Sequence, residues 1–232
     1  MAFDDYDEYE QSEQVRKWLR ENGLSIVVGV VLALALIFGW RQWQAHRAGH
    51  HAEAAEQYAV LEAALATNDG AKVDSAVNAL EKDFADTPYA ALGAAARANV
   101  AVGQGKLDDA HKALQWAVDH SPTAALHSIY QLRLARVELA QNQAQQALGL
   151  IEAVPGNDYR ATREELRGDA LLKLGRQNDA RSAYASALAA LSANAAPGLR
   201  DALQMKLDNL AQAGAPAAAP AATTTPPGKQ GT

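Results

Sequence analysis

The feature that most constrains this chain is an uncharged stretch near its N-terminus. Between Glu21 and Arg41 no residue carries a charge, and the centre of the stretch, residues 26–38, is apolar throughout. As a helix rising about 1.5 Å per residue, the nineteen residues from Asn22 to Trp40 would extend roughly 28 Å, close to the thickness of a bilayer's hydrocarbon core. A buried core helix would instead carry polar residues on one face. The stretch therefore predicts a membrane-spanning helix.

The residues around this stretch favour a retained anchor over a cleaved signal peptide. A signal peptide begins with a short basic segment, whereas an acidic tail precedes this stretch, and Trp40 and Trp43 close it in the manner of an interfacial belt. The nearby basic residues number three before the stretch and two after it: Arg16, Lys17 and Arg20, then Arg41 and Arg47. Under the positive-inside rule this margin of one favours a cytoplasmic N-terminus and a translocated C-terminal region. A cytoplasmic C-terminal region is the alternative.

Composition limits the remaining classes of function. The 232 residues leave room, beyond the anchor and the ends, for one domain of about 170 residues. The net charge of −6 comes from an acidic cluster within residues 4–13, and no basic footprint for nucleic acid is present. The absence of cysteine excludes disulfides, cysteine nucleophiles and thiolate metal sites.

These observations divide the chain into four parts. Residues 1–21 form an acidic cytoplasmic tail and juxtamembrane segment, residues 22–43 the transmembrane helix, and residues 44–213 one helical domain. Residues 214–232 are rich in Ala, Pro and Thr and are predicted to be disordered. Residues 1–13, which are acidic and short of aliphatic side chains, are also predicted to lack regular structure.

The domain contains an internal repeat of helical units. It is rich in alanine, and its apolar residues recur at helical rather than strand spacing. Four alanines that mark equivalent positions are separated by 34, 37 and 33 residues: Ala76, Ala110, Ala147 and Ala180. This period, together with Gly or Asn at the turns and small residues where two helices cross, is typical of tetratricopeptide repeats (TPRs). We therefore expect an all-α fold in which about four helix pairs form a TPR-like solenoid; an irregular helical bundle is the alternative.

A last helix is predicted after the fourth unit. Pro197 suits its first turn, and four leucines at helical spacing share one face: Leu199, Leu203, Leu207 and Leu210. We expect this helix to cap the open end of the solenoid.

Several stretches within residues 11–211 resemble one known family. The most telling are Gly39-Trp40-Arg41-Gln42-Trp43, Leu132-Arg133-Leu134-Ala135-Arg136-Val137, Arg167-Gly168-Asp169-Ala170-Leu171-Leu172 and Gln204-Met205-Lys206-Leu207-Asp208-Asn209-Leu210. Together they are similar to the YfgM-type ancillary subunits of the bacterial SecYEG translocon. The resemblance implies a single-pass inner-membrane protein with a cytoplasmic N-terminus and a periplasmic TPR-like domain. It also implies partners: the SecYEG channel, a membrane-anchored periplasmic peptidyl-prolyl isomerase chaperone, and exported client proteins that the domain helps to fold.

Enzyme chemistry finds little support in the sequence. No nucleophile elbow, phosphate-binding loop or dinucleotide fingerprint occurs, and the resemblance brings no catalytic residues, so we expect neither an enzyme nor a cofactor. His46 and His50 are four residues apart on an expected helix, with His51 and Glu53 following, and could bridge a metal. A polar helix that emerges from the headgroups is the preferred interpretation, and no metal site is predicted.

A stacked array of helix pairs offers a concave surface for binding. Projecting the TPR register onto the chain places six candidate residues there: Tyr58, Leu65, Asn99, Arg136, Glu165 and Asp169. Leucines on the same helices, such as Leu61, Leu132 and Leu139, could belong either to this groove or to the core. Ala95 stands where a carboxylate-clamp TPR places a lysine, which argues against a terminal-carboxylate ligand.

Two functions fit this architecture. The first is a translocon-associated binding module that handles exported chains in a chaperone-like manner. The second is a structural scaffold that links envelope proteins without contacting unfolded clients.

Overall fold

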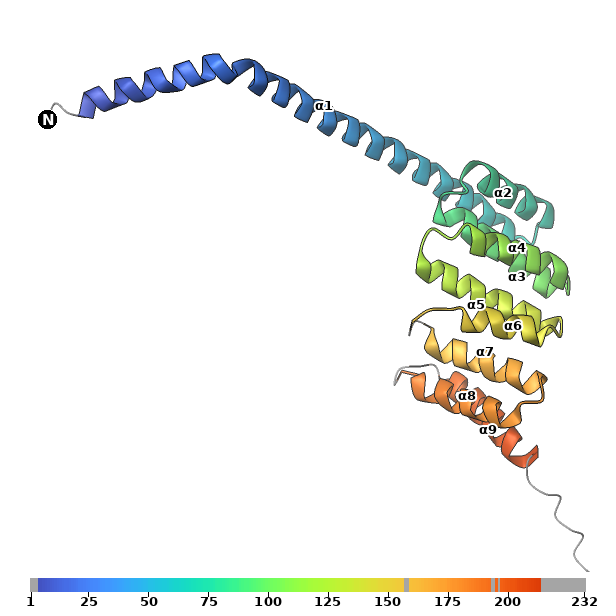
Figure 1. Cartoon of the computed structure of the whole chain (residues 1–232). Helices are drawn as coiled ribbons and strands as arrows, with labels where there is room; N and C mark the ends of the chain where they lie inside the picture. Colours follow the sequence, from blue (N-terminus) through green and yellow to red (C-terminus); the bar gives the residue numbers. More distant parts are fainter. Residues whose placement is uncertain (1–3, 157–158, 193–194, 196, 214–232) are drawn as a thin grey trace, which may run out of the picture.

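The computed structural model describes residues 4–156, 159–192, 195 and 197–213, and over these residues the chain forms nine α-helices and no strand (Figure 1). The all-α prediction is therefore confirmed. The helices are α1 (Asp4–Ala66), α2 (Gly70–Asp83), α3 (Pro88–Gly103), α4 (Leu107–Asp119), α5 (Ala124–Ala140), α6 (Ala144–Glu152), α7 (Arg160–Lys173), α8 (Gln177–Ala190) and α9 (Pro197–Ala213). The predicted disordered tail, residues 214–232, lies outside the described residues.

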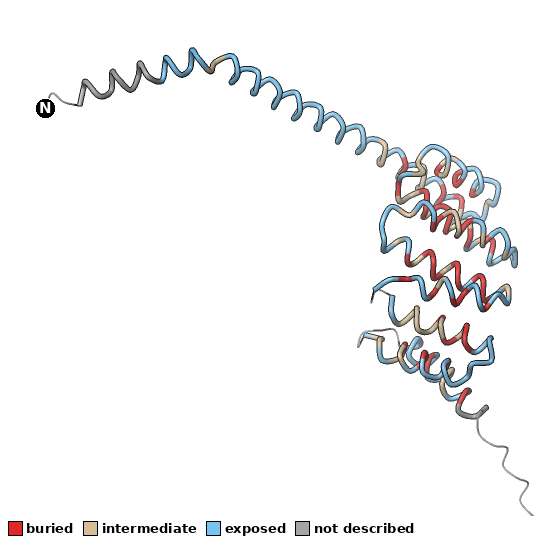
Figure 2. The backbone as a smooth tube through the Cα atoms, viewed as in Figure 1, coloured by how far each residue is buried: buried red, intermediate tan, exposed pale blue. Residues whose placement is uncertain are grey.

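Helix α1 is a single element of 63 residues, about 94 Å long at the usual rise per residue. Its apolar stretch is long enough to cross a membrane and is not covered by any other part of the described chain (Figures 1 and 2). The helix starts at Asp4, so the prediction that residues 1–13 lack regular structure is wrong from residue 4 onward. Extending an existing helix costs less than starting a new one, and this segment extends the helix of the apolar stretch.

The other helices stack as antiparallel pairs. The last turns of α1 pair with α2, and the pairs α3/α4, α5/α6 and α7/α8 follow, each packed against the one before (Figure 1). Contacts are made chiefly between helices that are consecutive in the chain. This arrangement is consistent with the expected TPR-like solenoid of four pairs and a final helix.

The turn inside each pair has the same backbone conformation. One residue in each turn has a positive φ: Asn68 (52°), Gly105 (72°), Asn142 (63°) and Gly175 (77°). Glycine and asparagine are the residues that adopt this left-handed conformation most readily, and they end helices in this way. The prediction of Gly or Asn at these turns is confirmed.

Small residues allow the paired helices to approach closely. The four marker alanines are all buried, Ala76 at 5% exposure and Ala110, Ala147 and Ala180 at 0%. In the fourth pair Gly168 of α7 faces the ring of Tyr184 of α8, and a Cβ added at Gly168 would overlap that ring. The buried residues, red in Figure 2, are concentrated on the stacked helices. The repeat identified from alanine spacing is therefore a repeat of helix crossings.

Helix α9 covers the end of the stack. Leu203 and Leu210 are buried in the core cluster of the last two pairs, and Leu207 packs against it. Leu199 is 39% exposed and lies outside this cluster. The reason is its position in the first turn of α9, before the helix comes to lie along the core.

Candidate partner-binding groove

Four of the six predicted groove residues follow one another across the first helices of successive pairs. Asn99 on α3 and Arg136 on α5 line one pocket, and Arg136 lines the next pocket together with Glu165 and Asp169 on α7. Arg136 and its neighbour Ala140 line both pockets. We call this surface, from Asn99 to Asp169, the first-helix groove.

The pocket between α3 and α5, here the α3–α5 pocket, has a volume of about 340 Å³. Its floor is apolar and includes Val102, which is 46% exposed, with Leu107 and Val137. Asn99 and Arg136 stand at its polar side. The combination of an apolar floor with a few polar groups is typical of sites that bind side chains or small ligands.

The pocket between α5 and α7, here the α5–α7 pocket, is larger, at about 500 Å³. Its acidic residues already have a partner from the last helix. Lys206 Nζ of α9 lies 2.8 Å from Glu165 Oε1 and 2.8 Å and 3.0 Å from the two carboxylate oxygens of Asp169. Tyr184 adds a hydrogen bond, because its hydroxyl donates to Asp169 Oδ1 at 2.8 Å. Glu165 and Asp169 thus tie α9 to α7.

This ionic cluster shifts two protonation equilibria. Burial by itself lowers the pKa of Lys206, but its hydrogen bonds to Asp169 and Glu165 outweigh burial and leave that pKa above its ordinary value. The pKa of Tyr184 is also raised, first by burial and then by its hydrogen bond to Asp169. Both groups therefore hold their protons more strongly in the folded domain than in an unfolded chain.

Tyr58 and Leu65 do not line either pocket. The ring of Tyr58 on α1 packs against Tyr89 on α3, with centroids 5.8 Å apart, and burial followed by the nearby Glu62 raises the pKa of Tyr58. Leu65 packs against the core cluster of the first pair. The leucines that the sequence left undecided, Leu61, Leu132 and Leu139, are buried in the core.

Sequence reasoning missed two side chains that line the candidate groove. Arg133 lies three residues before Arg136, one turn away on the same helix, and lines the α3–α5 pocket beside it. That spacing was a usable signal. Lys206 gave no such signal, since its partners lie 37 and 41 residues earlier in the chain.

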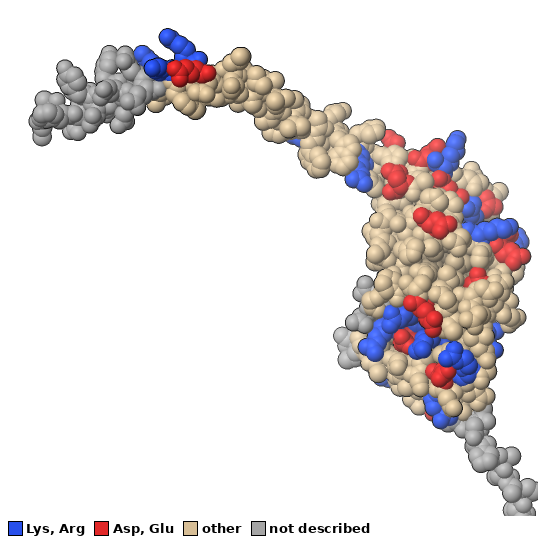
Figure 3. All heavy atoms as spheres, in the orientation of Figure 1, with Lys and Arg blue, Asp and Glu red and all other residues tan. Residues whose placement is uncertain are grey.

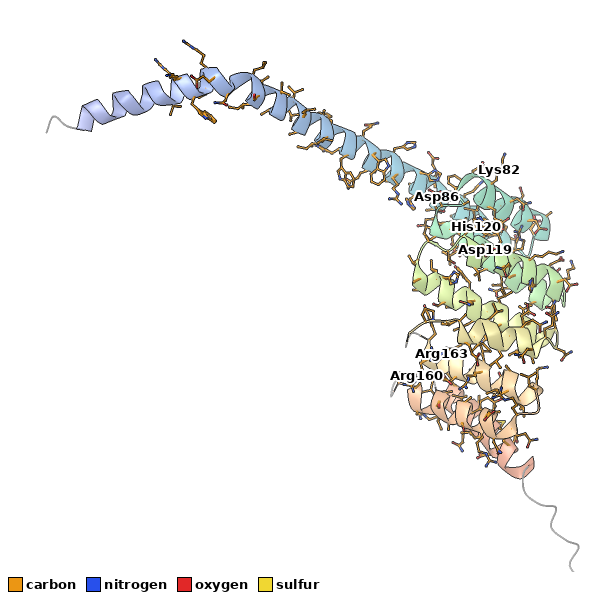
Figure 4. All side chains as sticks on the ribbon, viewed as in Figure 1. Lys82, Asp86, Asp119, His120, Arg160 and Arg163 are labelled. Atoms are coloured by element: carbon orange, nitrogen blue, oxygen red, sulfur yellow. The ribbon has the colours of Figure 1, made fainter. Side chains whose placement is uncertain are left out.

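One of the juxtamembrane histidines, His50, contacts the helical domain. His50 Nε2 lies 2.9 Å from Asp86 Oδ1 in the connection between α2 and α3, beside the junction of α1 with the domain (Figure 4). This hydrogen bond is the main reason that the pKa of Asp86 is lowered. Among the described residues no three metal-ligating side chains converge. His50 thus helps to fasten the helix to the domain.

A contact between a histidine and a buried carboxylate links α4 and α5 on another part of the domain. His111 Nδ1 lies 2.9 Å from Glu138 Oε1, and Glu138 is 4% exposed. Within the described residues the other carboxylate oxygen of Glu138 has no hydrogen-bond partner. This pair does not line the α3–α5 or α5–α7 pocket.

Comparisons with known proteins agree with this architecture. A family model described as a tetratricopeptide repeat-like domain matches residues 16–212. The protein named ancillary SecYEG translocon subunit in Escherichia coli (strain K12) is 34% identical over 205 residues, which cover 88% of this chain and 96% of that protein. Proteins of the same name are 30% identical in Haemophilus influenzae, over 78% of this chain and 88% of the relative, and 29% identical in Aggregatibacter actinomycetemcomitans, over 88% and 98%.

Proposed function

Because the chain belongs to the family of ancillary SecYEG translocon subunits, we propose that it is a non-enzymatic component of the Sec translocon whose TPR-like domain binds partner proteins beside the channel. The partners in this proposal are the SecYEG channel, a membrane-anchored periplasmic peptidyl-prolyl isomerase chaperone and exported client proteins. The domain assists folding or trafficking of those clients in a chaperone-like manner. Binding needs no catalytic residue, only an accessible groove.

The proposed topology is a single crossing of the bacterial inner membrane. Residues 22–43 span the bilayer, residues 1–21 lie in the cytoplasm, and residues 44–213 form the periplasmic domain. The apolar length of α1 and its exposed surface support the crossing. The one-residue excess of Lys and Arg before the stretch supports the direction.

The observation that carries the proposal is the continuity of α1. One helix contains both the apolar stretch and the first helix of the stack, with no break between them (Figure 1). From Trp43 to Ala54, the first buried residue, there are eleven residues, or about 16 Å of helix. A continuous helix holds the groove close to the membrane at a nearly fixed height. Such tethering raises the effective concentration of the groove near emerging chains.

Topology can be tested with single cysteines, because the natural chain has none. We expect Asp119→Cys, an exposed position on α4, to react with a membrane-impermeant maleimide in intact spheroplasts. Ser12→Cys should react only after the membrane is permeabilised. Labelling of Ser12→Cys alone in intact spheroplasts would reverse the proposed direction.

Client handling needs a separate test. The full chain in nanodiscs should slow the aggregation of a chemically denatured exported protein, and probes in the groove should crosslink to nascent exported chains in cells. Empty nanodiscs are the control. If neither effect occurs while the chain still co-purifies with SecYEG, the scaffold hypothesis replaces the chaperone-like one.

A further inference from the structure

We propose that the α3–α5 pocket binds a protein segment in which one large apolar side chain is flanked by acidic residues. This inference rests on the proposed function, since it names the chemistry of the segment that the groove receives. Three observations support it: the apolar lining of the pocket, the two arginines at its edge, and the binding of the neighbouring acids Glu165 and Asp169 by Lys206.

The floor suits one apolar side chain. Val102 is 46% exposed, although it is a large aliphatic residue facing a concave surface lined also by Leu107 and Val137. A volume of about 340 Å³ is at the small end of ligand-binding cavities. Covering this floor with a leucine or phenylalanine would remove apolar surface from water, as the central anchor of an interface does.

The edge of the pocket is positively charged and not neutralised. Arg133 and Arg136 both line it, and neither has a carboxylate within 4.0 Å among the residues that the structure describes. Arg133 instead lies over the ring of Tyr130, 5.9 Å from its centroid. Other arginines of the domain, such as Arg97 and Arg163, do pair with glutamates. A ligand carboxylate would supply the partner that the two pocket arginines lack.

The acids that share a pocket with Arg136 already have a cationic partner. Glu165 and Asp169 share the α5–α7 pocket with it, but both carboxylates are bound by Lys206. Within the part of the chain that the structure describes, the groove acids Glu165 and Asp169 are paired, whereas Arg133 and Arg136 have no carboxylate partner. Charge complementarity then selects an acidic ligand and disfavours a basic one.

A protein segment fits these features better than a lipid headgroup does. Asn99 beside the arginines can accept and donate hydrogen bonds to a peptide backbone, and the apolar floor matches a side chain. Helix α5 also lies midway along the stack, away from the apolar stretch of α1 (Figure 1). The acidic residues near the chain's own N-terminus are on the opposite side of the membrane in the proposed topology.

The test is a binding measurement with defined peptides and the full chain in phosphatidylcholine nanodiscs. The probe is a short fluorescent peptide with one Phe between two pairs of Glu; the control peptides replace either every Glu with Gln or the Phe with Ala. We expect fluorescence anisotropy to show that the probe binds at least about tenfold more tightly than either control. A tenfold change in Kd corresponds to about 1.4 kcal/mol of binding free energy. Equal binding of all three peptides would overturn the proposal.

Matched variants locate the site. Arg136→Glu should weaken probe binding about tenfold or more, whereas Arg200→Glu, the same charge change at an exposed position on α9, should leave it within about twofold. A peptide with Lys in place of Glu should bind Arg136→Glu better than it binds the natural chain. Val102→Asn should weaken binding of the probe, and adding Arg136→Glu to it should weaken that binding further by the same factor as in the natural chain. Equal effects of Arg136→Glu and Arg200→Glu would overturn the assignment.

Two further readouts separate the alternatives. Anionic vesicles of phosphatidylglycerol should not compete with the probe; competition that disappears in Arg136→Glu would overturn the proposal in favour of a lipid site.

Co-purification with SecYEG distinguishes a failure of the acidic-segment inference from a failure of the proposed function. If the natural chain co-purifies but does not bind the probe, the acidic-segment inference is wrong and the proposed function stands; if it binds the probe but does not co-purify, the proposed function fails.

Discussion

The uncovered stretch of α1 and the last turns of the same helix bury their apolar residues in different ways. In the stretch, Leu32, Leu36 and Phe38 are exposed at 59%, 74% and 74%, and residues 26–38 are apolar throughout. The face of this stretch seen in Figure 3 carries no charged side chain. In the last turns, Leu61 is fully buried and its neighbour Val60 is 54% exposed. One helix thus changes from an all-round apolar surface to a single apolar face.

This difference teaches how the same secondary structure is stabilised in two surroundings. A helix that is apolar on all sides needs a non-aqueous environment around its whole circumference, whereas one with a single apolar face needs only a neighbouring protein surface. The pattern changes near Arg41, where charges reappear. We expect substitutions in the two regions of α1 to affect different properties.

The largest expected effect comes from charges in the uncovered stretch. Leu32→Arg combined with Leu36→Arg should cost about 2.5–3.5 kcal/mol of insertion free energy for each arginine near the bilayer centre. The protein should then move from the carbonate-resistant membrane fraction to the extractable fraction. Leu32→Ala with Leu36→Ala should remain in the membrane. Full membrane retention of the double arginine variant would contradict the assignment of this stretch.

A core substitution in the last turns should have the converse effect. Leu61→Ala should lower the free energy of unfolding of the domain by about 2–5 kcal/mol, because it leaves a cavity among Val77, Leu80 and their neighbours. Val60→Ala, one residue earlier, should change it by less than about 0.5 kcal/mol. Thermal and urea unfolding followed by circular dichroism would measure both. Membrane fractionation should be unchanged in both variants.

Gly→Ala substitutions compare packed and uncovered positions, because each adds a single methyl group. Gly168→Ala places a Cβ against the buried ring of Tyr184, and we expect overpacking to cost about 1–3 kcal/mol, partly offset by the better helix propensity of alanine. A Cβ at Gly29 in the uncovered stretch or at Gly149 in α6 meets nothing within 4 Å. Those two substitutions should leave stability unchanged or raise it slightly, which melting temperatures would show.

Alkaline pH should weaken the domain through the cluster that holds α9. Lys206 and Tyr184 both have a folded-state pKa above the unfolded value, so their contribution is complete below the unfolded pKa of about 10 and is lost as pH rises through the folded pKa. Lys206→Met should remove part of this pH dependence and cost about 1 kcal/mol near neutrality, after allowance for solvent screening. Unfolding curves measured between pH 8 and about pH 11 would test this. An unchanged alkaline slope in the variant would remove Lys206 from the explanation.

The smallest effect is expected where the two regions of α1 meet. His50→Ala removes the hydrogen bond to Asp86, whose side chain is 66% exposed, and should cost well under about 1 kcal/mol. Added salt should diminish the difference from the natural chain. A loss as large as that of Leu61→Ala would show that this contact is essential for joining the helix to the domain.

Much of the fold follows from local patterns in the sequence. The alanine spacing located all four helix crossings, and Gly or Asn marked each turn, because close approach and a positive φ each demand a particular residue type. The acidic first residues were misjudged, because their composition does not show that they extend a helix already formed by the apolar stretch. The exposure of Leu199 could not be predicted, because helical periodicity does not show where a neighbouring core ends.

The candidate groove was less predictable than the fold. The TPR register brought Asn99 and Arg136 to one pocket, yet it could not show that Glu165 and Asp169 are bound by Lys206. Tyr58 and Leu65 have the correct register but pack against Tyr89 and the first core cluster. Projecting the TPR register onto the chain shows which residues lie on the concave face of the stack. It does not show which of their side chains are covered by residues of other helices.

The sequence by itself determined the apolar stretch, the helical class and the period of the repeat, because these depend on residue type and spacing along one chain. Only the tertiary structure decided that α1 continues without a break into the stack, that Leu61, Leu132 and Leu139 belong to the core, and that Lys206 of α9 binds the acids at one end of the groove. These outcomes depend on contacts between residues far apart in the chain. For example, the acids that share a pocket with Arg136 are bound by Lys206, which lies seventy residues after Arg136 in the sequence.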